Sequence, residues 1–477
     1  MNELCTRSAV DLAYLLATRA VSCVEVMDAH LEQIGEFNPR LNAIVTLDAD
    51  RARDTAANYD AKRTATPALP PLWGLPIAHK DLVLTRGMRT TFGSTLFADN
   101  VPDKDDLIVE RIRAAGAIAI GKTNTPEFGA GSQTFNRVFG ATRNPYDPTR
   151  TCGGSSGGAA VALAARMLPI ADGSDLGGSL RNPASFCNVL GLRPTPGRVP
   201  AYPTLNPWAD MAVQGPMARS VDDIALFLSI LVGDDPRVPL ALTDPGARFY
   251  PVTPLDLRGV RVALTTDFGL PVQAPIRACM EATGRLLQSL GATVEIAHPD
   301  LSGATEAFHA LRANGFRERF AALPPESRAE LKDTIRWNLA AGEALTVADL
   351  DRAWATRRTV YDRVAAFFGR YHFLIGPTTQ VLPFDVDQPY PTEIDGVPMK
   401  DYLEWMQSCA RLTVTGCPAL SLPAGFSSDG LPIGMQIVAP VRAEARLLAF
   451  AKSVEAATHH AAMLPDLLRA DRYTARP

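Results

Sequence analysis

The sequence predicts an α/β protein in which helices cover both faces of a mixed, twisted β-sheet. Short apolar runs alternate with helical segments over most of the chain. These runs predict strands at 75–78, 117–120, 259–264, 294–296, 373–375 and 419–422. Between about 300 and 370 the pattern is nearly all helical and carries no strand signal. That stretch therefore predicts a helical insertion or lid beside the sheet.

The N-terminal part of the chain predicts helices before the first strand. Ser22 precedes apolar residues that follow helical spacing from Val24 to Ile34, and serine is a preferred N-cap residue. We interpret residues 1–65 as an N-terminal helical region and residues 66–235 as a core. With the insertion, the whole chain from 1 to 477 is expected to form a single domain, because large α/β enzymes can be one domain.

Composition excludes several classes of protein. The 477 residues carry a formal net charge of −4, so the basic excess typical of nucleic-acid binding is missing. No run reaches the roughly 18 apolar residues of a membrane span, and the charged start is not a signal peptide. The seven cysteines are scattered, and no histidines are paired at HxxxH or HExxH spacing. We expect a cytoplasmic protein without metal, cofactor, membrane or nucleic-acid partner.

Two glycine- and serine-rich segments carry the most informative pattern. Gly153-Gly154-Ser155-Ser156-Gly157-Gly158 precedes a helical pattern that begins at Ala159, and a helix N-terminus offers free amides that favour negative charge. Further along, Gly177 and Gly178 precede Ser179. Paired glycines allow successive amides to converge on one point, as an oxyanion hole requires.

Several interpretations of this pattern compete. A phosphate loop is disfavoured because no Gly-Lys-Ser/Thr follows at Walker spacing and no GxGxxG opens a strand–helix unit. Gly153-x-Ser155-x-Gly157 matches a nucleophile elbow, but residues 144–148 form a turn where an elbow needs a strand. A structural glycine loop and a serine hydrolase without histidine remain open at this point.

The ordered series of motifs resembles the amidase signature family. The two glycine–serine segments are followed by Gly191-Leu-Arg-Pro-Thr-Pro-Gly-Arg198. Gly74-Leu-Pro-Ile-Ala-His-Lys-Asp81 and Gly121-Lys-Thr-Asn-Thr-Pro-Glu-Phe128 precede them, and Gly215-Pro-Met-Ala-Arg219 and Gly430-Leu-Pro-Ile-Gly-Met-Gln436 come later. The resemblance covers most of the chain and is weakest between about 240 and 371. It implies the α/β/α sandwich of that family and hydrolysis of a carbon–nitrogen amide bond.

The resemblance also implies a role for each matching residue. Ser179 is the implied nucleophile, Ser155 the cis-serine that relays a proton, and Lys80 the general base. The backbone amides implied for the oxyanion hole are those of Leu176, Gly177, Gly178 and Ser179. The residues implied to support the loops are Ser156, Asp175 and Arg181. No catalytic role falls to His79, because neighbouring strand residues point to opposite faces.

These residue types fit amide cleavage through an acyl-enzyme. A serine hydroxyl is a poor nucleophile until a base removes its proton. Lysine can be that base only when it is neutral, and burial at the end of a strand lowers its pKa. Two departures from the family pattern are Leu180, in place of isoleucine, and Asp172, in place of a small or apolar residue.

The substrate is expected to be a small-molecule amide, with aryl or acyl amides preferred and esters or carbamates as further candidates. The alternative function is the glutaminase subunit (A-type) of a tRNA-dependent amidotransferase. An ungapped alignment through Gly416-x-Pro418 places Met406 where that branch has its glutamine-binding acid, which disfavours the alternative. The oligomeric state is left open. Candidate pocket residues are Thr125, Phe128, Ser132, Gln133, Tyr202, Trp208, Trp337 and Trp405.

Overall fold

The computed structural model describes residues 1–66 and 68–469. Its largest sheet has eight strands in the order β10-β9-β11-β15-β14-β7-β8-β6. Strands β9, β10 and β11 are parallel to one another, whereas the pairs from β11 to β6 are antiparallel, so the sheet is mixed. The strands are β6 Ile170–Asp175, β7 Leu190–Arg193, β8 Val213–Ala218, β9 Arg261–Leu264, β10 Thr293–Ile296, β11 Phe373–Pro377, β14 Ala419–Phe426 and β15 Pro432–Val438.

A second sheet continues the arrangement beyond β6. It has three strands in the order β1-β3-β2: β1 Ile44–Leu47, β3 Ile118–Thr123 and β2 Pro76–Lys80. Strand β2 packs against β6, so the last residue of β2 lies beside the large sheet. The strands expected near 75–78 and 117–120 are therefore β2 and β3. The sequence did not predict β1, since its four residues give too short a pattern to distinguish a strand from a loop.

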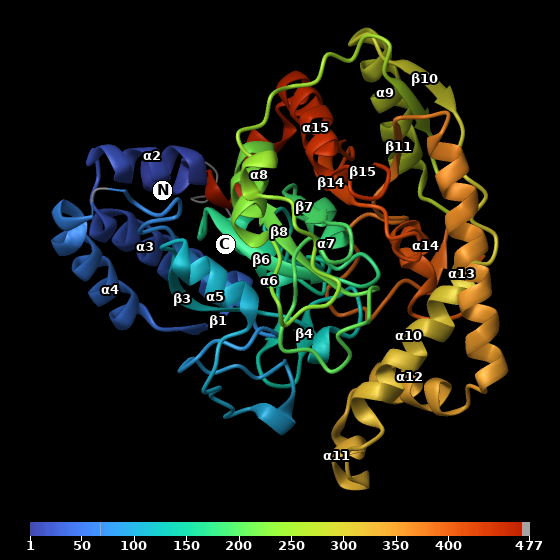
Figure 1. Ribbon diagram of the computed structural model, residues 1–477, viewed down its shortest axis with the longest axis horizontal. Helices are drawn as coiled ribbons and strands as arrows, with labels where there is room; N and C mark the ends of the chain where they lie inside the picture. Colours follow the sequence, from blue (N-terminus) through green and yellow to red (C-terminus); the bar gives the residue numbers. More distant parts are fainter. Residues whose placement is uncertain (67, 470–477) are drawn as a thin grey trace, which may run out of the picture.

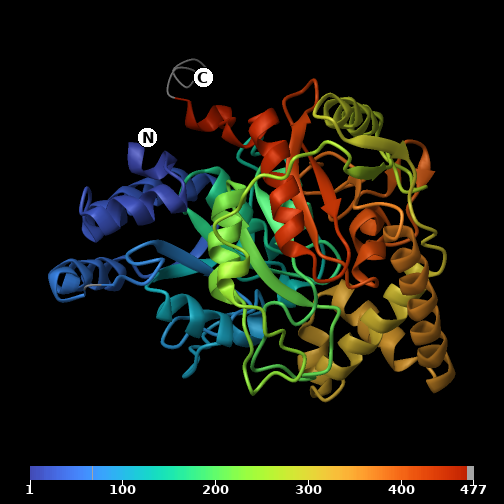
Figure 2. The ribbon, with the colours of Figure 1, turned by 45° about the horizontal axis from the view of Figure 1, so that its top comes forward.

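Helices cover both faces of the large sheet, as the sequence predicted. Helices α8 Val221–Leu231 and α15 Glu444–Thr458 pack together on one face, and α6 Gly157–Ala164 and α7 Arg181–Phe186 pack on the other (Figure 2). Helix α9 Ala274–Ser289 packs against β10, β11, β14 and β15, and α5 Leu107–Ala114 packs against α8. All eight residues of α6 are buried, because it runs through the interior.

The N-terminal helices lie at one end of the molecule (Figure 1). They are α1 Glu3–Thr6, α2 Ala9–Thr18, α3 Cys23–Leu41 and α4 Ala49–Lys62. The expected helix after Ser22 is confirmed as α3, and Ser22 and Glu25 form a reciprocal capping box at its start. The helix continues past Ile34 to Leu41, where Asn42 ends it in the left-handed conformation.

The helical stretch predicted between about 300 and 370 is confirmed. It contains α10 Ala304–Phe320, α11 Pro325–Glu330, α12 Asp333–Glu343 and α13 Val347–Phe368. Helix α10 packs against α12, α13 and α14 Gln407–Thr413, so the insertion meets the body of the protein along α14 (Figure 1). A separate apolar cluster joins Phe320, Leu331, Ile335 and Leu339 of the insertion to Ala130 of the body.

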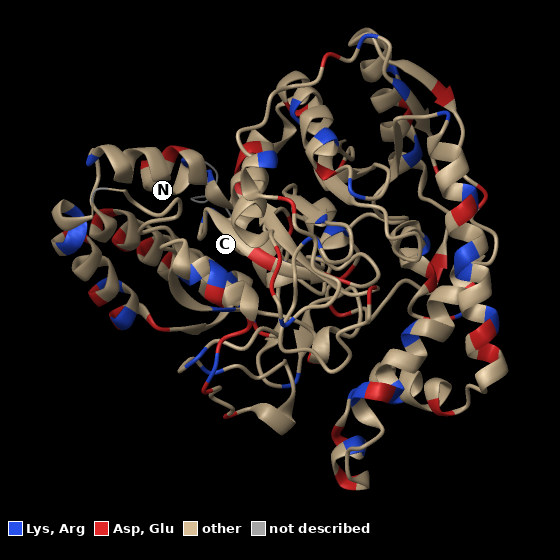
Figure 3. Ribbon diagram, in the orientation of Figure 1, with Lys and Arg blue, Asp and Glu red and all other residues tan. Residues whose placement is uncertain are grey.

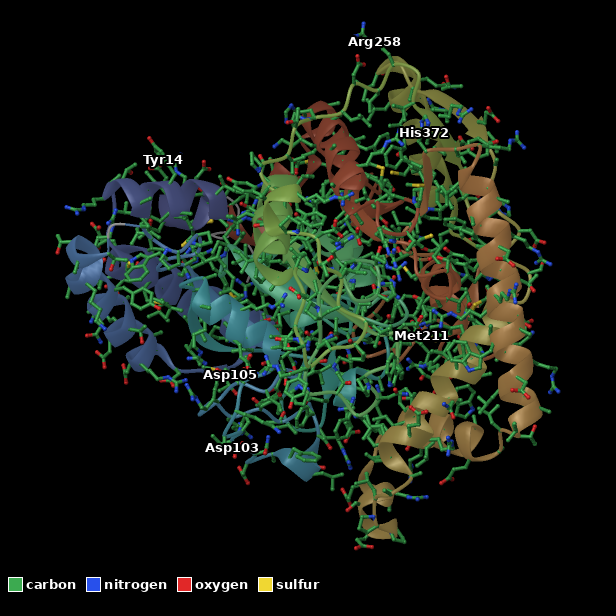
Figure 4. The ribbon with its side chains drawn as sticks, viewed as in Figure 1. Tyr14, Asp103, Asp105, Met211, Arg258 and His372 are labelled. Carbon is green, nitrogen blue, oxygen red and sulfur yellow. The ribbon has the colours of Figure 1, made fainter. Side chains whose placement is uncertain are left out.

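Charged residues of both signs are mixed along the outer helices in the view of Figure 3, while the central strands are nearly free of them. Figure 4 shows Tyr14 and Arg258 at the periphery, whereas Met211 lies in the interior on the side of the insertion. In the described part of the chain, no helix combines the length and apolar character needed to cross a membrane.

Candidate active site

Lys80 is the last residue of β2, and its side chain is completely buried. Its Nζ atom lies 2.7 Å from Ser155 Oγ, 2.9 Å from Ser156 Oγ and 3.0 Å from Ser174 Oγ. Three hydroxyl groups therefore surround one lysine nitrogen. A neutral amine can both donate to and accept from these hydroxyls, so the arrangement can pass a proton between nitrogen and oxygen.

The electrostatic surroundings of Lys80 favour its neutral form. Burial lowers the pKa of Lys80 from its usual value of 10.5 to about 7, although the carboxylates of Asp172 and Asp175 partly oppose this shift. Desolvation penalises the ammonium because no water stabilises its charge in the interior. Near neutral pH, a large fraction of the molecules consequently carries Lys80 as the neutral amine, which can act as a base.

The loop that carries Ser155 is held by the residues that precede β4, Phe135–Asn136. The peptide bond between Gly154 and Ser155 is cis. Ser132 Oγ donates to the Gly154 carbonyl at 3.2 Å, and Thr134 Oγ1 donates to the Gly153 carbonyl at 2.8 Å. Both main-chain oxygens before Ser155 are thus fixed by side chains, which holds the Ser155 hydroxyl in its position against Lys80.

The loop after β6 carries Ser179 beside the Ser155 loop. The Ser156 amide donates to the Ser179 carbonyl oxygen at 3.1 Å, which joins the two loops directly. Ser179 is 8% exposed, while Lys80 and Ser155 are 0% and 2% exposed. Ser179 is therefore the residue of this trio that a substrate can reach most easily.

Asp175 organises the Ser179 loop from within. Its carboxylate accepts hydrogen bonds from the Gly178 amide at 2.9 Å and the Leu180 amide at 3.2 Å, and it forms a two-point ion pair with Arg181. Burial alone would raise the pKa of Asp175, but the guanidinium groups of Arg181 and Arg193 outweigh burial and hold it below its usual range. Gly178 has φ +117, and an added methyl group there would lie 2.7 Å from Asn182 Nδ2. Glycine is therefore required at this turn.

We expect Asp175→Asn to destabilise the fold as well as the loop. Removing one partner of a buried ion pair leaves uncompensated charge, here on two buried arginines, and typically costs about 3–5 kcal/mol. Urea denaturation of both proteins would measure the loss in free energy of unfolding. Asp333→Asn is the matched control, because Asp333 is 90% exposed in its pair with Arg336 and should change stability by less than about 1 kcal/mol. Equal stability of the two variants would contradict the assigned role of Asp175.

The amides expected to form the oxyanion hole are not all equivalent. The Gly178 amide already donates to Asp175. Among the described residues, the amides of Leu176, Gly177 and Ser179 have no acceptor. These three donors have no partner within the described chain, and the part of all four amides in an oxyanion hole stays a prediction.

Two polar residues that the sequence did not assign to the site contact Lys80. The Ser174 hydroxyl meets Lys80 Nζ directly. Asp172, noted as a departure from the family pattern, accepts a hydrogen bond from the Lys80 main-chain amide at 2.8 Å and also binds His79 Nδ1. Asp172 and Ser174 are two apart on β6, so strand alternation places them on one face, and this spacing was a usable signal.

Two apolar side chains also approach the Ser179 loop. A methyl group added to Gly177 would lie 2.9 Å from Met406 Cε and 2.9 Å from Phe308 Cζ. Phe308 comes from α10 of the insertion, and Met406 precedes α14. These two side chains therefore form an apolar wall beside Gly177, one of the residues whose amide has no acceptor.

The pocket residues expected from the sequence fall into different surroundings. Thr125, Ser132 and Gln133 are buried, and the last two contact Gly154 of the Ser155 loop. Gln133 Oε1 has no hydrogen-bond partner among the described residues. Phe128 meets Phe320 of the insertion, with ring centroids 5.0 Å apart. Trp405 is 1% exposed and packs against Phe186 and Phe384, so it belongs to the core. Tyr202, Trp208 and Trp337 are 40%, 69% and 46% exposed.

The exposed candidates differ from the buried ones in their neighbours. Trp337 stands edge-on to Tyr402 at 5.8 Å, and the Arg237 guanidinium covers the Tyr202 ring at 4.6 Å. Within residues 1–66 and 68–469, none of the three exposed side chains forms a hydrogen bond or a ring contact with Lys80, Ser155 or Ser179. Contact of these rings with substrate stays a prediction.

A comparison with protein families decides what kind of protein carries this site. The family described as Amidase matches residues 25–448, which include every element of the site. The chain belongs to the amidase signature family. It is a hydrolase that acts on amide carbon–nitrogen bonds, as the motifs implied.

Two relatives with different names are similar to this amidase over almost their whole length. An acylamidase from Rhodococcus erythropolis is 34% identical over 454 residues, which is 94% of this chain and 95% of that protein. The A-type subunit of the glutamyl-tRNA(Gln) amidotransferase from Acidothermus cellulolyticus is 35% identical over 487 residues, 96% of this chain and 95% of that protein. In structure, a bacterial aryl acylamidase of the amidase signature family superposes with a TM-score of 0.88 and 28% identity, covering 99% of both chains.

Proposed function

We propose that this amidase hydrolyses aryl or acyl amides of small molecules, with Ser179 as nucleophile, Ser155 as proton relay and Lys80 as base. The observation that carries the proposal is the contact of a buried lysine, with its pKa lowered to about 7, with the Ser155 hydroxyl at 2.7 Å. Lysine in this state can accept a proton that a serine hydroxyl loses.

In the proposed reaction the Ser179 hydroxyl attacks the carbonyl carbon of the amide. Its proton passes to Ser155 Oγ while the Ser155 proton passes to Lys80 Nζ. The open amides of Leu176, Gly177 and Ser179 stabilise the negative charge that develops on the carbonyl oxygen. The same relay returns the proton to the leaving amine, and water then hydrolyses the acyl-enzyme by the reverse path.

The apolar wall formed by Phe308 and Met406 favours substrates with an apolar group next to the scissile bond. Aryl and alkyl groups fit this requirement. Esters and carbamates share the carbonyl chemistry and are further candidate substrates. The acylamidase and aryl acylamidase relatives act on amides by name, which supports the same class.

A second candidate function is that of the glutaminase component of a tRNA-dependent amidotransferase, because the A-type subunit of such an enzyme is equally similar in sequence. Glutamine carries an α-ammonium group that a carboxylate would pair with. At the aligned position this chain has Met406, and its Cε lies against Gly177 in the site. A thioether cannot neutralise an ammonium, so the position favours a substrate without one.

The deciding experiment compares the isolated chain on 4-nitroacetanilide, other aryl amides and simple primary amides with its activity on glutamine. We expect hydrolysis of aryl or acyl amides at rates at least about a hundredfold above those with glutamine. If glutamine is the one substrate that is hydrolysed, and if its hydrolysis requires added amidotransferase partner proteins, the result would instead support the amidotransferase role.

A further inference from the structure

Lys332 extends from the start of the insertion's α12 toward the loop that precedes the catalytic serine loop. Its main-chain amide donates to Glu127 Oε2 at 2.7 Å, and its side chain passes over the Phe135 ring, with Nζ 4.1 Å from the centroid. The first contact fixes the backbone at Lys332, and the second places the ammonium over the Phe135 ring. The ammonium therefore lies next to residues 130–131.

The ammonium of Lys332 forms no ion pair in the described part of the chain, although the carboxylates of Glu127 and Asp333 are near enough to act on its pKa. Nζ makes one hydrogen bond, to the Ala130 carbonyl at 3.4 Å, and forms no ion pair. Burial lowers the pKa of Lys332 to about 8, while Glu127 and Asp333 raise it, so the ammonium form predominates at pH 7. An ammonium has three donors, and at least one remains open here.

Open space lies beside that ammonium. A methyl group added to Gly131 would have Lys332 Nζ at 3.8 Å, and no other described atom outside the adjoining residues lies within 4 Å. Among the described atoms, only this nitrogen borders the space that a side chain at position 131 would occupy.

The same loop begins next to the catalytic relay. A methyl group added to Gly129 would lie 3.4 Å from Ser155 Oγ. Consecutive Cα atoms are about 3.8 Å apart, so Lys332 Nζ lies within about 18 Å of Ser155 Oγ. A linear substrate a few bonds longer than its amide group is long enough to reach from Ser155 to this ammonium.

We propose that Lys332 binds a carboxylate carried by the amide substrate at the end remote from the scissile bond, so that it determines specificity without taking part in the chemistry. The inference rests on the proposed function. The carboxylate can belong to the acyl half or to the amine half, and the choice of substrates distinguishes the two.

The test measures kcat/KM for paired substrates. For the acyl half, the 4-nitroanilides of succinic, adipic and suberic acid are compared with their methyl esters. For the amine half, N-acetyl-4-aminobenzoate is compared with its methyl ester. The wild type should prefer the free acid of at least one pair by about tenfold or more, since a hydrogen bond to a charged group is worth about that factor.

Three variants separate charge recognition from structure. Lys332→Met should lower the acid-to-ester ratio of kcat/KM by about tenfold, and Lys332→Arg should retain most of it. Lys62→Met, at the exposed end of the distant α4, should leave the ratio unchanged. Equal ratios in the wild type and Lys332→Met would overturn the inference while the proposed function stands. If the wild type hydrolyses none of these amides, whether they carry the free acid or the methyl ester, both the inference and the proposed function would be overturned.

Discussion

Ser179→Ala is expected to lose covalent labelling by a fluorophosphonate probe and at least about a thousandfold in amide hydrolysis. The nucleophile forms the bond to the acyl group, and removing such a residue leaves only the contribution of binding and the oxyanion hole. The variant should keep its fold, because Ser179 contributes its main-chain carbonyl, not its hydroxyl, to the bond with the Ser156 amide. Peptide mass mapping of the labelled wild type identifies the modified residue.

Ser156→Ala is the matched control for Ser155→Ala, because both hydroxyls contact Lys80 Nζ in the same loop. Ser155→Ala should slow labelling of Ser179 by removing the relay. Ser156→Ala should slow it less, because Ser156 stands outside the proposed relay path. Modification of Ser155 in the wild type, or undiminished turnover in Ser179→Ala, would refute the assigned nucleophile.

The family resemblance named Lys80, and local sequence pattern added the reason that its pKa could be low. The apolar run before Lys80 predicted a buried strand that ends at this residue, and burial there lowers the pKa of the lysine. The role of Lys80 as base stays a prediction. The family motifs also included Ser155, which lies in a glycine-rich loop, and Asp175, which ends β6 just before the Gly177-Gly178 turn. Ser156 was expected to support a loop, and it also contacts Lys80.

Contacts between segments that are far apart in the sequence could not be predicted from motifs or local pattern. Phe308 reaches Gly177 only because α10 packs against α14, and no spacing in the sequence encodes that packing. For the same reason Trp405 could not be distinguished from a pocket residue: an aromatic residue in a core and one in a pocket wall look alike in sequence. Lys332, another residue of the insertion, has no motif of its own.

Lys80→Met and Lys80→Arg are expected to lower amide hydrolysis by about 100- to 10,000-fold, the range that general acid–base catalysis supplies. Methionine has no basic nitrogen, and arginine keeps its proton at any accessible pH. Ester hydrolysis should fall less, because an alkoxide leaving group needs its proton less than an amine does. Lys122→Met is the matched control, since Lys122 is equally buried on the neighbouring β3 but bonds to Thr85 Oγ1 and the Val83 carbonyl.

The pH dependence follows from the same lysine. The neutral amine is the active base, so protonation below its pKa removes activity and the rate should rise with pH through about 7. A pH–rate profile of kcat/KM for an aryl amide measures this midpoint in the free enzyme. Lys122→Met should keep it if the variant folds, whereas the residual rate of Lys80→Met should lack the rise. A rise centred near pH 7 in folded Lys80→Met, with near-normal turnover, would mean that another group is the base.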